Sequence, residues 1–269
     1  DNCNAALPEE QKKLGLEIKQ SNLCSEITLP TNEERTAVCC LSSVNLEHFD
    51  EWSKVDTFIP DLITMLDNVL QNFIDSVEGK SGYSKAAYSA MRERSVGLGA
   101  MGFHSYLQRN NIAFESMYAS SFNNKAFSYI KDRASATTRK LAEERGEAPD
   151  MKGSGKRNAH LLAIAPNASS SIICGGTSPS IEPIRANVYT HKTLTGSFKV
   201  KNKYLDDLLL EIVPTKKKLD EVWKDIAAHE GSVQHLDILS DSQKEMFKTA
   251  PEINQIWIVE HAYKRQEFV

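Results

Sequence analysis

The stretch His160-Leu-Leu-Ala-Ile-Ala-Pro-Asn-Ala-Ser-Ser-Ser171 indicates which class of fold this chain adopts. Residues 160–166 form a short apolar run that ends at a proline, which predicts a buried strand. Asn167 and the serines after it are typical of a helix N-terminus, so we expect a helix to begin there. A buried strand that leads directly into a helix is typical of α/β proteins.

Helical periodicity dominates the sequence outward from this stretch. Between residues 55 and 77 the apolar side chains recur at helical spacing, with Pro60 in an early turn. Further helices are predicted over residues 84–107, 122–144, 205–212, 219–228, 242–249 and 253–267. Loops and short strands are predicted up to about residue 45, and a polar, glycine-rich loop over residues 151–157. With no internal repeat or linker, the chain is predicted to be a helix-rich α/β protein.

Composition narrows the possible partners and the compartment. The 269 residues are 41% hydrophobic and 25% charged, which is globular composition, and the formal net charge is -4. That charge gives no broad basic field, so we expect neither nucleic acid nor a membrane surface as a partner. Asp1 opens a polar stretch instead of a secretory signal, and no apolar run is long enough to span a bilayer. Five cysteines without regular spacing favour a reducing compartment, and we expect a cytoplasmic protein.

The first candidate site is Ser21-Asn-Leu-Cys-Ser-Glu-Ile27. In an extended chain alternate side chains face the same way, so Asn22, Cys24 and Glu26 would line one surface. They would offer a hydrogen-bond anchor, a redox centre and a base. A cysteine taken alone is more often a small buried packing residue, but the neighbouring amide and carboxylate favour a function.

Two adjacent cysteines, Cys39 and Cys40, form the second candidate site, in a predicted strand between Arg35 and Asn45. Because strand faces alternate, one thiol should point toward the side of Cys24 and the other away. Only one of them need be active. The alternatives are a core cysteine pair or a metal site, and we expect no metal because no C-x-x-C spacing or nearby H-x-x-x-H accompanies them.

The third candidate site is the turn Ala165-Pro-Asn-Ala-Ser-Ser-Ser171. Its small residues let a ligand approach, and the unpaired N–H groups and dipole of a helix start favour an anion. A phosphate group held by Asn167, Ala168, Ser169 and Ser170 is the natural ligand. An ordinary helix N-cap is the alternative.

Two glycine motifs are set aside as nucleotide sites. Gly97-Leu-Gly-Ala-Met-Gly102 has the spacing of a dinucleotide-binding loop, but the charged segment before it predicts a helix instead of a buried strand. Helix packing is the preferred explanation of its glycines. Gly79-Lys-Ser81 is similar to the end of a phosphate-binding loop, but Ile74 stands where the leading glycine belongs.

Taken in order along the chain, these segments resemble the large subunit of class I ribonucleotide reductases. Asp1-Asn-Cys-Asn4 is similar to the segment before the active-site loop, and residues 21–27 to the thiyl-radical loop. Ala37-Val-Cys-Cys-Leu-Ser42 resembles the strand with the redox cysteine, and Arg94-Ser-Val-Gly-Leu-Gly-Ala-Met-Gly-Phe103 a barrel helix. Residues 165–170 and 177–183 resemble the phosphate-binding turn and the segment that follows it.

The resemblance implies reduction of ribonucleoside diphosphates to 2′-deoxyribonucleoside diphosphates for DNA precursor synthesis, with a role for each thiol-loop residue. Cys24 would be the transient thiyl radical that removes the 3′ hydrogen of the substrate. Glu26 would be the base on the 3′ hydroxyl, and Asn22 would hydrogen-bond the substrate. Cys39 would be one half of the dithiol that reduces the 2′ carbon.

Substrate binding is the role that the resemblance implies for Ser25 and for the turn from Asn167 to Ser170. The backbone of the turn would hold the phosphates. Cys40 would occupy a neighbouring position without a redox role.

The family fold is a ten-stranded α/β barrel of two half-barrels, with the active cysteine on a central finger loop. Residues 1–49 would supply that loop and the redox-cysteine strand, and residues 50–269 the second half-barrel with its surrounding helices. The other redox cysteine, the N-terminal effector region for ATP and deoxynucleotides and the C-terminal tyrosine and cysteine motifs are expected on segments outside this chain. The start at Asp1 instead of methionine agrees with that expectation.

The expected partners are a ribonucleoside diphosphate, the remaining segments of the large subunit, thioredoxin or glutaredoxin, and a second large subunit in a homodimer. A separate small subunit would generate the radical with its own metal cofactor, and no cofactor is expected in this chain. By itself the chain is expected to be inactive. The alternatives are a cobalamin or glycyl-radical relative and a catalytically inactive, partner-binding α/β fragment.

Overall fold

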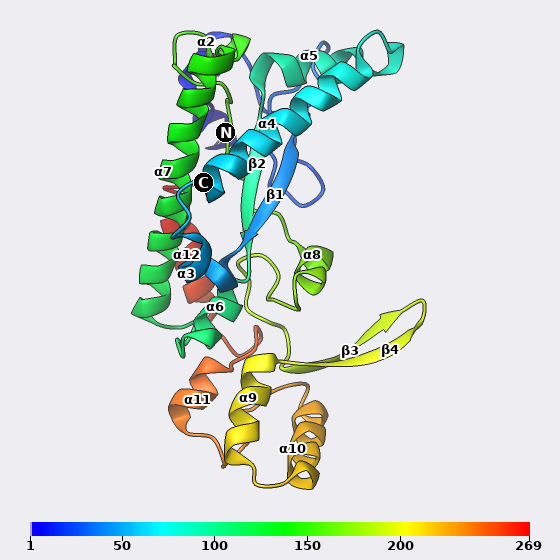
Figure 1. Cartoon of the computed structure of the whole chain (residues 1–269), viewed down its shortest axis with the longest axis vertical. Coiled ribbons are helices and arrows are strands. Elements are labelled where there is room, and N and C mark those ends of the chain that lie inside the picture. The colour runs from blue at the N-terminus through cyan, green and yellow to red at the C-terminus, as the bar shows by residue number, and fades with distance from the viewer. Residues whose placement is uncertain (1) are drawn as a thin grey trace.

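A computed structural model describes residues 2–269, and Asp1, the first residue of the segment likened to the family's pre-loop region, lies outside the described residues. The α-helices are α1 (Asn2–Ala5), α2 (Glu9–Lys13), α3 (Phe49–Trp52), α4 (Phe58–Val77), α5 (Ser84–Glu93), α6 (Phe103–Arg109), α7 (Met117–Arg145), α8 (Ala168–Ile173), α9 (Lys203–Ile212), α10 (Lys216–Ala228), α11 (Asp241–Met246) and α12 (Gln255–Arg265). The strands are β1 (Cys40–Asn45), β2 (Val96–Met101), β3 (Val188–Thr193) and β4 (Gly196–Lys201), and the 3₁₀ helices are η1 (Leu46–His48), η2 (Ser81–Tyr83) and η3 (Pro149–Met151). Figure 1 shows β1 and β2 in the centre, α7 along one side and α9 to α11 in a second group below.

Strands β1 and β2 are parallel, with Cys40 opposite Val96 and Asn45 opposite Met101. Residues 160–163 run along the other edge of β2: the N–H of Leu98 donates to the carbonyl of Leu161 at 2.8 Å, and the N–H of Ala163 donates to Leu98 at 3.2 Å. The predicted strand over 160–166 is therefore extended and paired, although it forms only a single β-bridge, between Leu98 and Leu162. Within residues 2–269 these strands make an open parallel sheet and not a closed barrel, and the predicted helix-rich α/β class is confirmed.

The single helix predicted over residues 84–107 is confirmed at its two ends, as α5 and the start of α6, and is wrong between them. Helix α5 ends at Glu93, because Arg94 adopts a left-handed conformation with φ 47°, and α6 starts only after Gly102, with φ 79°. Between them lies β2, whose six residues are all buried. A strand buried on both faces is a continuous apolar run, which periodicity alone does not distinguish from a helix.

The glycines of β2 allow a neighbouring segment to pack closely on the strand, and they do not contribute to helix packing. A Cβ atom on Gly99 would lie 2.4 Å from the carbonyl oxygen of Ala163, and one on Gly97 would lie 2.4 Å from Leu41 Cδ2 and 2.9 Å from Ala163 Cβ. Residues 160–163 can therefore pack closely on this strand only because it lacks side chains at these positions. The segment likened to a barrel helix is a strand. Because Gly97 and Gly99 lie within the strand and not in a turn after it, a dinucleotide loop remains excluded.

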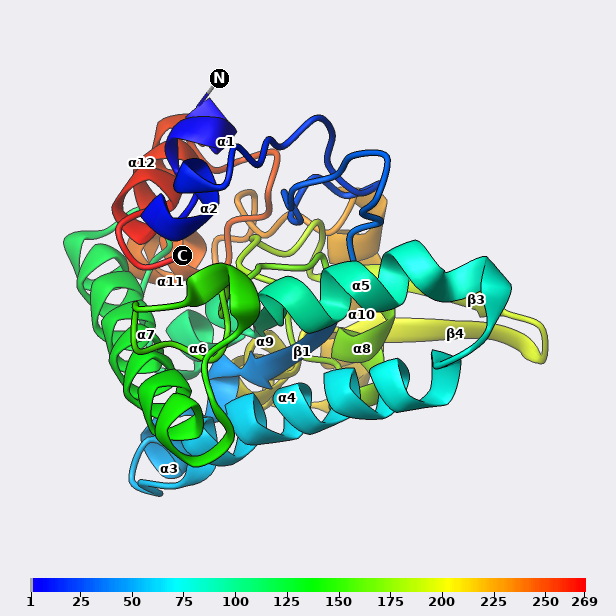
Figure 2. The same ribbon diagram turned by 90° about the horizontal axis from the view of Figure 1, so that it is seen from above.

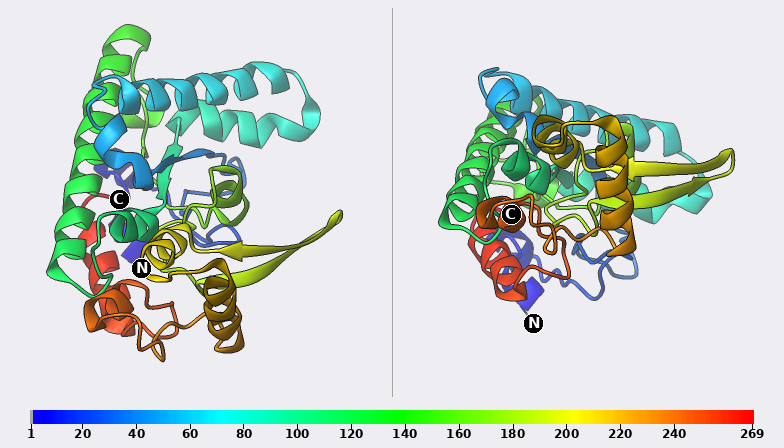
Figure 3. Two further views of the ribbon diagram at one scale, coloured as in Figure 1. Left: turned by 60° about the horizontal axis from the view of Figure 1, so that its bottom comes forward. Right: turned by 90° about the horizontal axis from the view of Figure 1, so that it is seen from below.

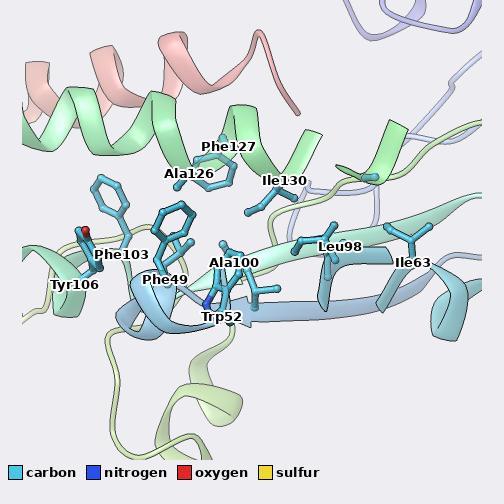
Figure 4. Close-up of a cluster of buried hydrophobic side chains, with 14 of the residues drawn as sticks. Phe49, Trp52, Ile63, Leu98, Ala100, Phe103, Tyr106, Ala126, Phe127 and Ile130 are labelled. Atoms are coloured by element: carbon cyan, nitrogen blue, oxygen red, sulfur yellow. The ribbon is translucent and has the colours of Figure 1, made fainter. Parts of the chain in front are cut away.

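The main hydrophobic core lies between β1–β2 and helices α4 and α7 (Figure 4). Phe49 anchors it, with edge-to-face contacts to Trp52 at 4.9 Å and to Phe122 at 5.5 Å between ring centroids. Tyr106 stacks on Phe122 at 3.6 Å. Burial of one such aromatic side chain contributes about 1.5–3 kcal/mol, so this cluster determines how α7 packs on the sheet.

Helices α4 and α5 lie side by side along the sheet (Figure 2). The predicted helix over 55–77 is confirmed as α4, with Pro60 in its first turn. The helices predicted over 122–144, 205–212, 219–228, 242–249 and 253–267 are confirmed as α7, α9, α10, α11 and α12. Helix α7 begins five residues earlier than predicted, where Ser116 Oγ accepts from the N–H of Ala119 and caps it.

A second hydrophobic cluster joins α9, α10 and α11 around Trp223, which is 2% exposed. The hairpin β3–β4, which the sequence did not predict, projects from this region (Figure 3). Helices α1 and α2 were also not predicted. Among residues 2–269, no helix is long and apolar enough to cross a membrane.

Candidate active site

The loop with Cys24 is a tight turn and not the extended strand that was predicted. The N–H of Ser25 donates to the carbonyl of Asn22 at 3.2 Å, and Ser25 has a left-handed φ of 63°. Asn22 closes the loop: its N–H donates to the carbonyl of Ile27 at 3.2 Å, and its Oδ1 accepts from the N–H of Ile27 at 3.1 Å. Asparagine favours such local side-chain to backbone bonds, and this preference outweighed the alternation assumed from the sequence.

The turn separates the environments of the three predicted residues. Asn22 and Cys24 are exposed at the tip, whereas Glu26 is half-buried. The Oε2 atom of Glu26 is shielded from solvent and has no hydrogen-bond partner among the described residues. A buried carboxylate oxygen without a partner is costly, so it is a site where a ligand hydroxyl would be favoured.

Cys39 and Cys40 point to opposite faces, as the predicted alternation requires. Cys40 begins β1 and packs against the main core. Cys39 Sγ lies on the other face, 3.4 Å from the position that a Cβ of Gly97 would take. Burial, with smaller contributions from Cys40, Glu93 and Glu26, raises the pKa of the Cys39 thiol to about 12. Cys39 is therefore a protonated thiol at neutral pH, within electrostatic reach of Glu26.

Cys39 directly precedes β1 and lies on the same face of the sheet as Ser43, which connects this face to the predicted phosphate turn. Asn167 adopts a left-handed φ of 54° immediately before α8. In the orientation that satisfies its neighbours, its amide nitrogen donates to the carbonyl oxygens of Ala165 at 2.8 Å and Ala100 at 3.2 Å, and its Oδ1 accepts from Ser43 Oγ at 3.0 Å. The Asn167 side chain thus fixes the turn to the sheet and is not free for a ligand.

The backbone of the turn remains available. Ala168, Ser169 and Ser170 are exposed, and in the described part of the chain no acceptor pairs with their N–H groups. Three adjacent donors at a helix start suit an anion. This geometry agrees with the predicted backbone phosphate site, whose occupancy remains a prediction.

Glu93 is a residue near the site that the sequence did not indicate. It is fully buried at the end of α5, where Oε1 accepts from Ser89 Oγ at 3.0 Å and Oε2 accepts from Gln11 Nε2 at 3.3 Å. Burial raises the pKa of Glu93 to about 7, although both hydrogen bonds and the charge of Arg35 oppose that effect. No sequence pattern signalled it, because a carboxylate between two arginines on a helix is normally exposed.

Comparisons with known proteins converge on one family. The family model described as the barrel domain of ribonucleotide reductase matches residues 1–155 and 148–269. The ribonucleoside-diphosphate reductase large subunit of Invertebrate iridescent virus 3 is 51% identical over 269 residues, covering 100% of this chain and 42% of the viral protein. The corresponding subunit of Invertebrate iridescent virus 6 is 48% identical over 248 residues, covering 91% of this chain and 26% of that protein.

A solved structure matches the fold as well as the sequence. The class Id ribonucleotide reductase alpha subunit of Actinobacillus ureae superimposes with a TM-score of 0.91 at 41% identity. The match covers 100% of this chain and 49% of the bacterial chain. The chain thus spans less than half the length of these relatives.

Proposed function

Since the chain belongs to the ribonucleotide reductase large-subunit family, we propose that it supplies the thiol loop, one redox cysteine and the phosphate turn of an enzyme that reduces ribonucleoside diphosphates. The complete activity requires the other segments of the large subunit and a small subunit that generates the radical. The observation that best supports this assignment is the buried Oε2 of Glu26, which has no hydrogen-bond partner among residues 2–269 and lies within electrostatic reach of the Cys39 thiol.

The proposed reaction divides the work between different sulfur atoms. A radical on Cys24 takes the 3′ hydrogen of the ribose and returns it to C3′ after the reduction, which restores the radical, and an exposed thiol at a loop tip can approach a substrate. Glu26 accepts the proton of the 3′ hydroxyl, since its free oxygen is an acceptor in a site shielded from water. Asn22 and Ser25 then have the roles of substrate contacts beside Cys24.

Reduction at the 2′ carbon follows from the chemistry of Cys39. The C2′–O bond breaks, water leaves, a C2′–H bond forms, and two thiols become a disulfide, so two electrons pass from sulfur to the substrate. Cys39 supplies one of those thiols, and the other belongs to a segment outside this chain. The high pKa of Cys39 keeps the thiol protonated until reduction, as a hydrogen donor requires.

Phosphate binding orients the ribose over these groups. The unpaired N–H groups of Ala168, Ser169 and Ser170 would bind the diphosphate, while Asn167 holds their turn against Ser43. Cys39 therefore lies on the same face of the sheet as the turn that would bind the phosphates of the substrate. Binding energy from the phosphates would position the sugar for hydrogen abstraction.

The test is reduction of a labelled ribonucleoside diphosphate by the assembly of this chain with the remaining large-subunit segments and the small subunit. Cys24→Ser and Cys39→Ser should abolish turnover, and Glu26→Gln should lower kcat by roughly 100-fold. Cys40→Ser is the matched control, because Cys40 packs into the core on the opposite face of β1.

Three outcomes contradict the proposal. Undiminished turnover of Cys24→Ser or Cys39→Ser would remove that cysteine from its role. A requirement for cobalamin would move the enzyme to another radical class. An assembly that folds but forms no deoxynucleotide with the unsubstituted chain would favour a catalytically inactive, partner-binding fragment.

A further inference from the structure

Two histidines and one aspartate converge on the surface of the helix group α9 to α11, away from the thiol loop and the phosphate turn. Asp225 lies in the last turn of α10, His229 caps the same helix, and His235 lies in the loop that follows. One ligand atom from each of them falls within 4.8 Å of the other two. From this geometry we propose that Asp225, His229 and His235 form a binding site for a divalent transition-metal ion of the zinc type.

The distance from each histidine to the Asp225 carboxylate is close to the separation of two ligand atoms around such an ion. His235 Nε2 lies 3.0 Å from Asp225 Oδ2, and His229 Nδ1 lies 3.2 Å from the other carboxylate oxygen, Oδ1. Zn2+ in tetrahedral coordination, with bonds of about 2.0–2.1 Å, holds its ligand atoms about 3.3 Å apart. Two imidazoles and one carboxylate also favour Zn2+ over Mg2+ or Ca2+, which bind mainly to oxygen ligands.

The backbone that carries the ligands is already fixed. Asp225 and His229 are four residues apart at the end of α10, so they lie on one helix face. The helix ends in a turn in which the N–H of Gly231 donates to the carbonyl of Ile226 at 2.8 Å. Gly231 has φ 88°, and a Cβ there would lie 2.6 Å from Ala186 Cβ, so the turn packs tightly against residue 186.

The loop after the turn holds His235 equally firmly. Its neighbours Val233 and Leu236 are buried in the second hydrophobic cluster. Gln234 Nε2 donates to the carbonyl of Lys244 at 2.9 Å, which ties the loop to α11. A metal would thus bind side chains whose backbone needs no rearrangement, which reduces the entropic cost of binding.

One side-chain movement accompanies binding. The rings of His229 and His235 stack at 3.7 Å between centroids with 23° between their planes, so their nitrogens do not yet point at one ion. The His229 side chain is 50% exposed, so it can turn until a nitrogen of each ring faces one ion, and it then gives up the contact of Nδ1 with the carbonyl oxygen of Asp225 at 3.0 Å. The ion would link the end of α10 to the loop before α11, and this role is independent of the proposed reduction.

The experiment is a titration of the purified 269-residue chain with Zn2+, after chelation and with its thiols blocked by N-ethylmaleimide. Blocking is needed because Cys3, Cys24 and Cys174 are exposed and would also bind zinc. Calorimetry gives the affinity, and a thermal melt with and without Zn2+ gives the stabilisation. The variants are His229→Gln, His235→Gln and Asp225→Asn. The matched control is His48→Gln, because His48 is an exposed histidine that faces a single carboxylate, Glu51, at 3.6 Å.

Support would be one Zn2+ per chain with micromolar affinity and a higher Tm. Each site variant should weaken binding by roughly tenfold or more and remove the Tm increase, while His48→Gln changes neither. Circular dichroism confirms that each variant folds. Equal affinity in the site variants and the control, or saturation only at millimolar Zn2+, would show that these residues are a hydrogen-bonded His–Asp cluster without a metal role.

Discussion

The substitution Gly99→Ala tests how the sheet holds the phosphate turn. The new Cβ would lie 2.4 Å from the carbonyl oxygen of Ala163 and 3.1 Å from Ser43 Oγ. Ordinary contact begins at 3.4 Å, so the backbone at Ala163 must move away by about 1 Å. The atom that blocks the new methyl group belongs to the backbone and not to a flexible side chain, so the whole 160–163 segment must move with it.

The expected cost follows from two effects. Overpacking of a tight core costs about 1–3 kcal/mol. The hydrogen bonds that join Leu98 to Leu161 and Ala163 would lengthen, and each contributes about 1 kcal/mol. Reduced entropy of the unfolded chain returns about 0.5–1 kcal/mol. We therefore expect Gly99→Ala to lower the free energy of unfolding by about 3 kcal/mol.

The assay is urea unfolding of the chain, followed by circular dichroism. Gly82→Ala is the matched control, since no atom lies within 4 Å of its Cβ position, and it should change stability by less than about 0.5 kcal/mol. In the reconstituted enzyme Gly99→Ala should also raise the KM for the diphosphate, because the turn at Asn167 shifts with the 160–163 segment. Equal midpoints for the two variants would refute the close packing of this segment on β2.

Three further predictions concern titratable groups. At pH 8 iodoacetamide should alkylate exposed Cys24 at least roughly tenfold faster than Cys39, because burial raises the pKa of Cys39 to about 12. Peptide mapping measures both rates, and equal rates would contradict the burial of Cys39. Burial raises the pKa of Glu93 from 4.5 to about 7, so its contribution to stability is complete below pH 4.5 and is lost as pH rises through about 7. Between pH 5 and pH 8 the unsubstituted chain should therefore lose about 2 kcal/mol of unfolding free energy that the variant Glu93→Gln does not lose. Stability curves that run parallel for the two proteins would disprove this. Burial lowers the pKa of His104 from 6.5 to about 3, so its contribution is present above pH 6.5 and is lost as pH falls. The variant His104→Asn keeps an acceptor for the N–H of Ile184. Between pH 7 and pH 5 it should lose about 2 kcal/mol less unfolding free energy than the unsubstituted chain, and urea midpoints at the two pH values measure this difference.

The order of the motifs along the sequence is enough to identify the family. Helices such as α4 and α7 were also predictable, because a surface helix repeats its apolar face along the chain. The opposite orientations of Cys39 and Cys40 followed from the alternation of a strand. The backbone amides after Asn167 were anticipated for the same kind of reason, since a helix start leaves its first N–H groups unpaired.

Other features depended on the tertiary structure. Strand β2 was predicted as helix because the sequence around it does not show which strands it pairs with. Its hydrogen bonds with β1 and with residues 160–163 make it a strand. The approach of Glu93 to Cys39 joins segments far apart along the chain. Local propensity and side-chain chemistry are properties of a short stretch of sequence. Burial, pKa and ligand distances, including those at Asp225 and His235, depend on which segments packing brings together, and that is decided by the folded chain as a whole.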